Sequence, residues 1–334
     1  MPELVVISAN GGVGKTSIVA SLATMARPVV MADCNVNTPH LHLVVKSKAW
    51  RRFPFRSTSK PRIEASHCLA CGKCEELCRF HAVLFDGPGN GRIPKTRRID
   101  PVACEGCAVC HRFCPHQAIE FLPSPCGQWF VSKTRWGPLV HGRLNSLAGG
   151  SGKLIDQLRQ EARKLVARDG QLLLCDSCPG IGSPVIASLT GADLALIVTE
   201  PTRTGLHALG RVFLLCRRFG IESVLAINKW DISETLTEQI EAQAREWQLQ
   251  SVGRIRYDPA VGEAQFKQKS VVEYAPATGI VQDLRHLWKC LQPRLQKTKA
   301  GQPSDSLGAG ETLSAPHRKA GKGPAKRRLD RRCH

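Results

Sequence analysis

Two runs of cysteine with the same spacing constrain the fold of this chain more than any other feature. Each run reads C-x2-C-x2-C-x3-C. Gaps of two residues let three thiolates converge on one centre from a single tight loop, so each run predicts a compact metal-binding loop. The positions are Cys68, Cys71, Cys74 and Cys78 in the first run, and Cys104, Cys107, Cys110 and Cys114 in the second.

Two kinds of metal centre use such cysteines. Zinc sites also take paired C-x2-C units, but the complete run occurs twice here, and this run is typical of [4Fe–4S] clusters. The segment resembles the bacterial two-cluster ferredoxins, in which the fourth cysteine of each run binds the opposite cluster. The resemblance predicts one cluster on Cys68, Cys71, Cys74 and Cys114, and a second on Cys104, Cys107, Cys110 and Cys78.

A glycine-rich loop near the start of the chain predicts phosphate binding. Residues 9–16 read Ala-Asn-Gly-Gly-Val-Gly-Lys-Thr, between a predicted strand and a predicted helix. Backbone N–H groups of such a loop turn towards phosphate oxygens, Lys15 would reach the β- and γ-phosphates, and the Thr16 hydroxyl would bind Mg²⁺. The alternative is a glycine turn without a ligand. The expected contact residues are Gly11, Gly12, Val13, Gly14, Lys15, Thr16 and Ser17.

Strands and helices alternate outside the cysteine region. Apolar runs without polar interruption predict strands buried on both faces of a mainly parallel sheet, as in α/β proteins. The expected strands are 4–7, 28–33, 172–176, 194–198, 223–228 and 251–255, and the expected helices are 16–26, 152–168, 205–219, 233–247 and 280–295.

The α/β alternation stops between residues 46 and 136, which we therefore predict to be an insert. Residues 1–45 and 137–296 would form one discontinuous P-loop nucleotide-binding domain. The insert would contain an α+β ferredoxin-like domain over about 60–122. Residues 297–334 hold ten Lys and Arg against three Asp and Glu, with little that could be buried, and are expected to be a disordered basic tail.

Together these motifs resemble the deviant Walker A ATPases of the MinD and Mrp type, in the branch with an inserted ferredoxin domain. The resemblance implies Mg-ATP as the nucleotide, with Lys15 and Asp33 as catalytic residues. It also implies that Asp176 supports Mg²⁺, Gly180 senses the γ-phosphate and Asn228 contacts adenine. A nucleotide-dependent homodimer is implied as well.

Two residues depart from the pattern of that family. Asn10 stands where the family has a lysine that reaches the partner's phosphates, and Asn35 stands where it has an aspartate that orients water. Neutral amides cannot take a proton from water, so we expect ATP binding with slow or conditional hydrolysis.

Composition narrows the location and the partners. The chain contains no run of about 18 apolar residues, so no membrane span is expected. Residues 1–6 lack the features of a signal peptide, which favours the cytoplasm. The net charge of +19 attracts polyanions. The chain shows no helix-turn-helix pattern, so sequence-specific recognition of nucleic acid is not expected.

These features lead to one favoured function and two alternatives. The favoured function is a nucleotide-dependent redox protein that carries two [4Fe–4S] clusters and exchanges electrons with a protein partner. The first alternative is an iron–sulfur cluster carrier or maturation ATPase, whose partner would be an apo-acceptor. The second is a positioning or partitioning module of the MinD kind.

Overall fold

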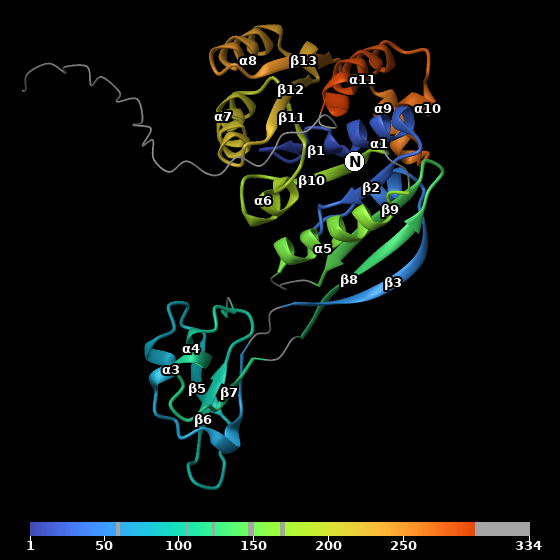
Figure 1. The fold of residues 1–334 in the computed structure, drawn as a ribbon. Helices are drawn as coiled ribbons and strands as arrows, with labels where there is room; N and C mark the ends of the chain where they lie inside the picture. The colour runs from blue at the N-terminus through green and yellow to red at the C-terminus, as the bar shows by residue number, and fades with distance from the viewer. Residues whose placement is uncertain (58–60, 105, 122–123, 146–149, 168–170, 298–334) are drawn as a thin grey trace, which may run out of the picture. The chain divides into compact units, whose positions relative to one another are not determined.

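The computed structural model describes residues 1–297 except 58–60, 105, 122–123, 146–149 and 168–170. A nine-stranded sheet forms its centre (Figure 1), with strand order β13-β12-β11-β1-β10-β2-β9-β8-β3. From β13 to β9 neighbouring strands are parallel, whereas β8 runs antiparallel to both β9 and β3. In sheet order the strands are β13 (Gln250–Ile255), β12 (Glu222–Asn228), β11 (Leu194–Thr199), β1 (Glu3–Ser8), β10 (Leu173–Pro179), β2 (Val30–Asp33), β9 (Pro138–Leu144), β8 (Ser124–Lys133) and β3 (Lys48–Ser57).

Helices cover both faces of this sheet, which confirms the predicted α/β fold. Every residue of β1 and β11 is buried, as expected of strands packed on both sides. One apolar core lies under α5 (Ser151–Lys164), α6 (Ser183–Leu189), α7 (Arg203–Arg218) and α8 (Glu234–Glu246). The other lies under α1 (Lys15–Ala26), α2 (Leu41–Val44), α9 (Ala260–Phe266), α10 (Val271–Tyr274) and α11 (Gly279–Lys297).

Two helix starts follow directly from side-chain capping. The Thr202 hydroxyl accepts a hydrogen bond from the N–H of Gly205 at the start of α7, and Ser233 does the same for Leu236 at the start of α8. Such caps satisfy N–H groups that have no partner inside the helix. A short 3₁₀ helix, Trp230–Ile232, precedes α8.

The region predicted as an insert contributes strands to the main sheet at both of its ends. β3 pairs with β8, and β8 pairs with β9, so residues 48–57 and 124–133 extend the nucleotide-binding sheet. The cysteine-rich segment lies between these two strands in sequence. The expected tail lies outside the described residues from 298 onward.

The cysteine-rich segment has its own small core. β4 (Arg62–Ile63) pairs with β7 (Ile119–Glu120), and β5 (Val83–Gly87) pairs with β6 (Thr96–Ile99), both antiparallel. The helices α3 (Lys73–Glu76) and α4 (Val109–Arg112) contain Cys74 and Cys110, and a 3₁₀ turn (Ala65–His67) precedes Cys68. The core residues are Cys74, Val83 and Ile119, with Ile63, Cys78, Ile99, Cys110 and Cys114 packed against them.

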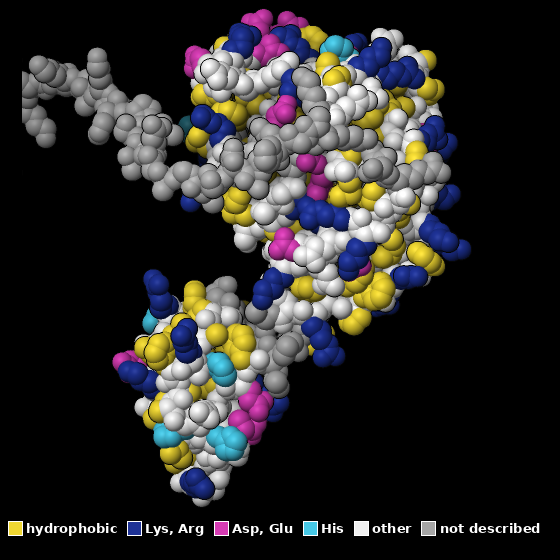
Figure 2. All heavy atoms as spheres, viewed as in Figure 1, with side chains coloured by type: hydrophobic (Ala, Val, Ile, Leu, Met, Phe, Trp, Pro, Cys, Tyr) yellow, Lys and Arg dark blue, Asp and Glu magenta, His cyan; other side chains and the backbone are white. Residues whose placement is uncertain are grey.

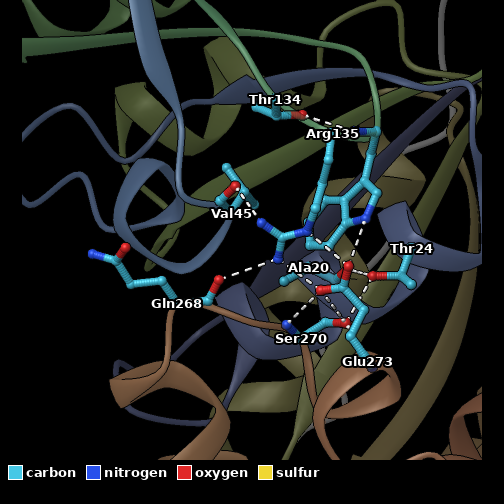
Figure 3. Close-up of polar contacts among 9 residues, drawn as sticks. Ala20, Thr24, Val45, Thr134, Arg135, Gln268, Ser270 and Glu273 are labelled. Atoms are coloured by element: carbon cyan, nitrogen blue, oxygen red, sulfur yellow. Dashed lines mark hydrogen bonds and ion pairs between the residues drawn. The ribbon is translucent and has the colours of Figure 1, made fainter.

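The turn between β8 and β9 is tied to α1 and α10 by a polar network (Figure 3). The Arg135 guanidinium donates to both carboxylate oxygens of Glu273 at 2.7 Å. Glu273 also accepts from the indole N–H of Trp136 at 3.2 Å and forms a capping box with Ser270. The Ser270 hydroxyl lies 2.7 Å from that of Thr24 in α1. The end of β8 is therefore linked to the helix that follows the glycine loop.

Candidate functional site: a phosphate loop and two cysteine runs

The glycine loop joins β1 to α1 with two of its glycines in the left-handed region. Gly12 and Gly14 have φ values of 77° and 88°, which residues with a Cβ rarely adopt. A Cβ on Gly14 would also lie 2.4 Å from Nδ2 of Asn228. The side chain of Asn228, which is predicted to contact the base, donates a 2.9 Å hydrogen bond to the carbonyl oxygen of Val13. This bond stabilises the loop.

Lys15 is held under this loop. Its ammonium donates a 2.6 Å hydrogen bond to the Ser8 hydroxyl, which itself donates to the carbonyl oxygen of Asn10 at 2.6 Å. Burial lowers the pKa of Lys15, while the nearby Asp176 carboxylate opposes that shift. A buried cation at the start of a helix suits an anionic ligand, because the phosphate would replace the lost hydration.

Two buried carboxylates lie next to the loop. Asp33 ends β2 and pairs in register with Asp176 of β10. Burial raises the pKa of Asp33 well above its ordinary value, and Asp176 raises it further. Burial also raises the pKa of Asp176 to about 6, although Thr16 and Lys15 lower it. Two carboxylates in one buried site favour a bound cation, because it would offset their repulsion.

The hydrogen bonds of this pair leave one oxygen for a ligand. Asp33 accepts from the backbone N–H groups of Asn35 and Leu41 at 3.0 and 3.1 Å. Asp176 accepts from the Thr16 hydroxyl through Oδ2 at 2.6 Å, whereas its buried Oδ1 has no partner in the described part of the chain. Oxygen ligands of this kind fit Mg²⁺. The donor set therefore suits the Mg-nucleotide that the sequence predicts.

A cavity of about 340 Å³ opens beside the loop. Gly12, Gly14, Ser17 and Asn228 line it, all of them predicted contact residues. Residues 256–259, directly after β13, also line it and were not among the predicted site residues. Their position could have predicted this, because ligands of parallel sheets bind beyond the carboxyl ends of the strands. Gly11 and Val13 belong to the same loop, and the Gly180 N–H donates to the carbonyl oxygen of Ser8.

The two cysteine runs adopt matching conformations. The first cysteine of each run accepts a 3.4 Å hydrogen bond from the N–H two residues later, which is Ala70 in one run and Gly106 in the other. The fourth cysteine accepts a 3.3 Å bond from the N–H four residues later, which is Ala82 or Ala118. N–H groups directed at sulfur stabilise the thiolate form that iron requires.

One cavity of this segment gathers the predicted ligands of the second cluster. Cys78 from the first run lines it together with Cys104, Cys107 and Cys110. Apolar side chains complete the walls, and burial raises the pKa of Cys110 to about 11. Four thiols around a cavity with apolar walls suit an iron–sulfur cluster, because bound iron would stabilise their thiolate forms.

The other predicted set is brought together less completely. Cys74 and Cys114 share the small core of the segment, and Cys68 and Cys71 lie near Cys74. No three His, Cys, Asp or Glu side chains in the described ranges are grouped to hold a single metal ion. No helix of those ranges is long and apolar enough to cross a bilayer.

Comparison with known proteins assigns the cysteine segment to a family. Residues 67–118 match the family model of the 4Fe-4S dicluster domain. The uncharacterized protein MJ0578 of Methanocaldococcus jannaschii is 32% identical over 232 residues, which cover 68% of this chain and 78% of that protein. The pyruvate synthase subunit PorD of Methanothermobacter marburgensis is 31% identical over 75 residues, which cover 22% of this chain and 73% of PorD.

Solved structures support the fold of the remainder. The septum site-determining protein MinD of Pyrococcus horikoshii, solved with Mg-ADP, superposes with a TM-score of 0.52. The match covers 87% of this chain and 95% of MinD at 14% identity. At that identity the likeness establishes a shared fold, the mainly parallel sheet of MinD-type P-loop proteins.

Proposed function

Because this chain belongs to the family of MJ0578 and joins a MinD/ParA-type P-loop fold to a 4Fe–4S dicluster domain, we propose that it is a nucleotide-dependent iron–sulfur redox protein. It would bind Mg-ATP and two [4Fe–4S] clusters and exchange electrons with a protein partner. The similarity of the cysteine segment to a subunit of pyruvate synthase supports a redox partner.

The observation that carries the proposal is a continuous path of paired strands from the nucleotide site to the cysteine segment. Asp33 at the end of β2 pairs with His141 of β9, and His141 pairs with Phe130 of β8. The chain returns from the cysteine segment through β8, and it enters that segment through β3. A shift of β2 on nucleotide binding would therefore reach both strands that flank the clusters.

Different residues of the site would bind the phosphates, the Mg²⁺ ion and the adenine. Lys15 and the loop N–H groups of residues 11–17 would hold the phosphates, and Thr16 would bind Mg²⁺ with support from Asp33 and Asp176. Asn228 would contact adenine and Gly180 the γ-phosphate. The bound cation would offset the charge of the two buried carboxylates.

The cluster ligands follow the crossed arrangement. Cys78 would complete the site of Cys104, Cys107 and Cys110, as the shared cavity supports. Cys114 would complete the site of Cys68, Cys71 and Cys74. Each cluster would supply a one-electron store, and the N–H groups directed at sulfur would favour its reduced form.

The alternatives make different predictions for the same preparation. A cluster carrier would lose its iron to an apo-acceptor, whereas a redox protein would keep its clusters through repeated reduction and oxidation. A positioning module would need neither an apo-acceptor nor clusters that survive redox cycling. A nucleotide-dependent homodimer in the cytoplasm belongs to the proposal.

The proposal is tested by purifying the protein without oxygen and measuring iron, sulfide and reversible reduction with and without Mg-ATP. We expect two clusters that survive redox cycling and respond to the nucleotide. Transfer of iron to an apo-acceptor, or zinc in place of iron, would overturn it.

A further inference from the structure

We propose that the outer edge of the sheet, formed by β3 and its neighbour β8, is a docking surface for an acidic protein, with Trp50 as its apolar anchor. The proposal gives a chemical character to the partner of the proposed function and depends on that function for the partner's role.

The charged residues of these two strands are all basic. β3 and β8 contain no acidic residue. No ion pair in the described ranges involves Lys48, Arg51, Arg52 or Lys133. Lys48 and Lys133 are direct cross-strand partners, and like charges in that position destabilise a sheet. Carboxylates from a partner would relieve the repulsion. In Figure 2, dark blue side chains recur along the side where Figure 1 draws β3.

The same edge strand exposes the indole of Trp50. The β3–β8 register shifts between Ala49 and Arg51, which leaves Trp50 at an irregular position of the strand. Such irregularities redirect a side chain. Trp50 is 52% exposed, and the charged groups of Arg51 and Lys133 lie 4.2 and 4.9 Å from its ring centroid. Tryptophan with arginine is the composition of energetic hot spots at protein interfaces.

Edge protection alone explains only part of this surface. Basic residues, irregular register and a proline such as Pro54 keep exposed sheet edges from pairing with other sheets. Protection of the edge requires the charges, but it does not require a half-exposed tryptophan with two cations close to its ring. The surface therefore has a binding role in addition to protecting the edge.

The choice of occupant follows from the same observations. The same edge of a second copy offers no carboxylate, because β3 and β8 contain no acidic residue, so this edge does not suit pairing with itself. Single-stranded nucleic acid stacks successive bases on several aromatic rings. In β3, Phe55 is buried and Phe53 stacks on Trp129 at 4.1 Å, so Trp50 is the exposed ring of that strand. An acidic protein segment fits best.

Binding of a synthetic peptide of alternating Glu and Leu residues to the intact, cluster-loaded protein tests the surface by calorimetry. We expect Arg51→Glu with Arg52→Glu to weaken binding about tenfold or more, and Trp50→Ala to weaken it several-fold. The matched control is Lys267→Glu with Lys269→Glu. It makes the same change in charge at two exposed positions between α9 and α10.

The outcomes separate this proposal from the proposed function. Carbodiimide should cross-link the peptide to Lys48 or Lys133. Equal weakening by both charge-reversal pairs would overturn the docking surface, as would tighter binding of oligothymidylate than of the peptide. Melting temperature and cluster absorbance establish that each variant is folded. If the anaerobically purified protein contains no clusters but still binds the peptide at this edge, the surface stands and only the redox function is contradicted.

Discussion

The Thr16 hydroxyl donates a 2.6 Å hydrogen bond to Oδ2 of Asp176, while Oδ1 of the same carboxylate is buried without a partner among the described residues. This pair connects the start of α1 to the middle of β10. It places a hydroxyl and an unsatisfied carboxylate oxygen where a Mg-nucleotide would bind.

Replacing Thr16 with alanine should remove the effect of Mg²⁺ on nucleotide binding. The hydroxyl is the predicted magnesium ligand, so we expect affinity for Mg-ATP to fall about tenfold or more, or roughly 1.4 kcal/mol. Affinity for ATP measured in EDTA should change little. Calorimetry checks both values. Thr190→Ala removes an exposed threonine hydroxyl elsewhere and serves as the control; equal losses in the two variants would contradict the assignment.

Replacing Cys78 with serine should remove the cluster of the second cysteine run rather than that of its own run. Iron should fall from about eight to about four atoms per chain. The electron paramagnetic resonance signal that remains should match that of Cys104→Ser and differ from that of Cys74→Ser. Cys290→Ser should keep all the iron. A Cys78→Ser signal identical to that of Cys74→Ser would show that each run binds its own cluster.

Much of the site could be predicted because its residues are close in sequence. The glycine loop and each cysteine run are local patterns, so their spacing alone indicates phosphate binding and cluster binding. The helix expected at 16–26 forms at 15–26, and the strands expected at 194–198 and 223–228 form at 194–199 and 222–228. These elements are apolar and continuous, so local pattern and packing agree.

Long-range pairing explains what the sequence could not predict. Lys48–Ser57 has mostly exposed side chains and no buried apolar run, so it was assigned to the insert although it forms the edge of the main sheet. The Cys34 N–H donates a 2.9 Å hydrogen bond to the carbonyl oxygen of Asp176, although the two residues are far apart in sequence. Neither contact has a signal in local spacing.

Asparagine at positions 10 and 35 should limit the rate of ATP hydrolysis. The Asn35 N–H donates to Asp33, but its side chain is a neutral amide that cannot accept a proton from water. We expect the double variant Asn10→Lys with Asn35→Asp to hydrolyse ATP at least about tenfold faster, since tenfold needs only about 1.4 kcal/mol of barrier. Phosphate release measures the rate. An unchanged rate would show that other residues limit hydrolysis.

The Arg135–Glu273 pair should stabilise the protein more than an ordinary surface ion pair. Glu273 also binds Trp136 and Ser270, so Glu273→Gln breaks several bonds and should cost about 1–3 kcal/mol of unfolding free energy. The control Glu241→Gln breaks a similar two-bond contact with the more exposed Arg254 and should cost about 1 kcal/mol or less. Urea unfolding compares the two variants.

Acid should destabilise the protein partly through His141. Burial lowers the pKa of His141 to about 4, and its ring contacts Ser132, His42 and Phe130. The unfolded chain takes up this proton near the ordinary histidine pKa of about 6.5, so stability falls as pH drops from about 6.5 towards 4. His141→Gln should flatten this part of the pH profile. An unchanged profile would assign the effect to other groups.

The reduction potential of the clusters, measured with and without Mg-ATP on the same anaerobic preparation, tests the central claim most directly. Coupling between the nucleotide site and the clusters predicts a shift of roughly 60 mV, which for one electron corresponds to a tenfold change in nucleotide affinity on reduction. The shift should disappear in Thr16→Ala. Clusters that form and cycle normally, yet keep one potential and one partner affinity whether or not Mg-ATP is bound, would contradict the account.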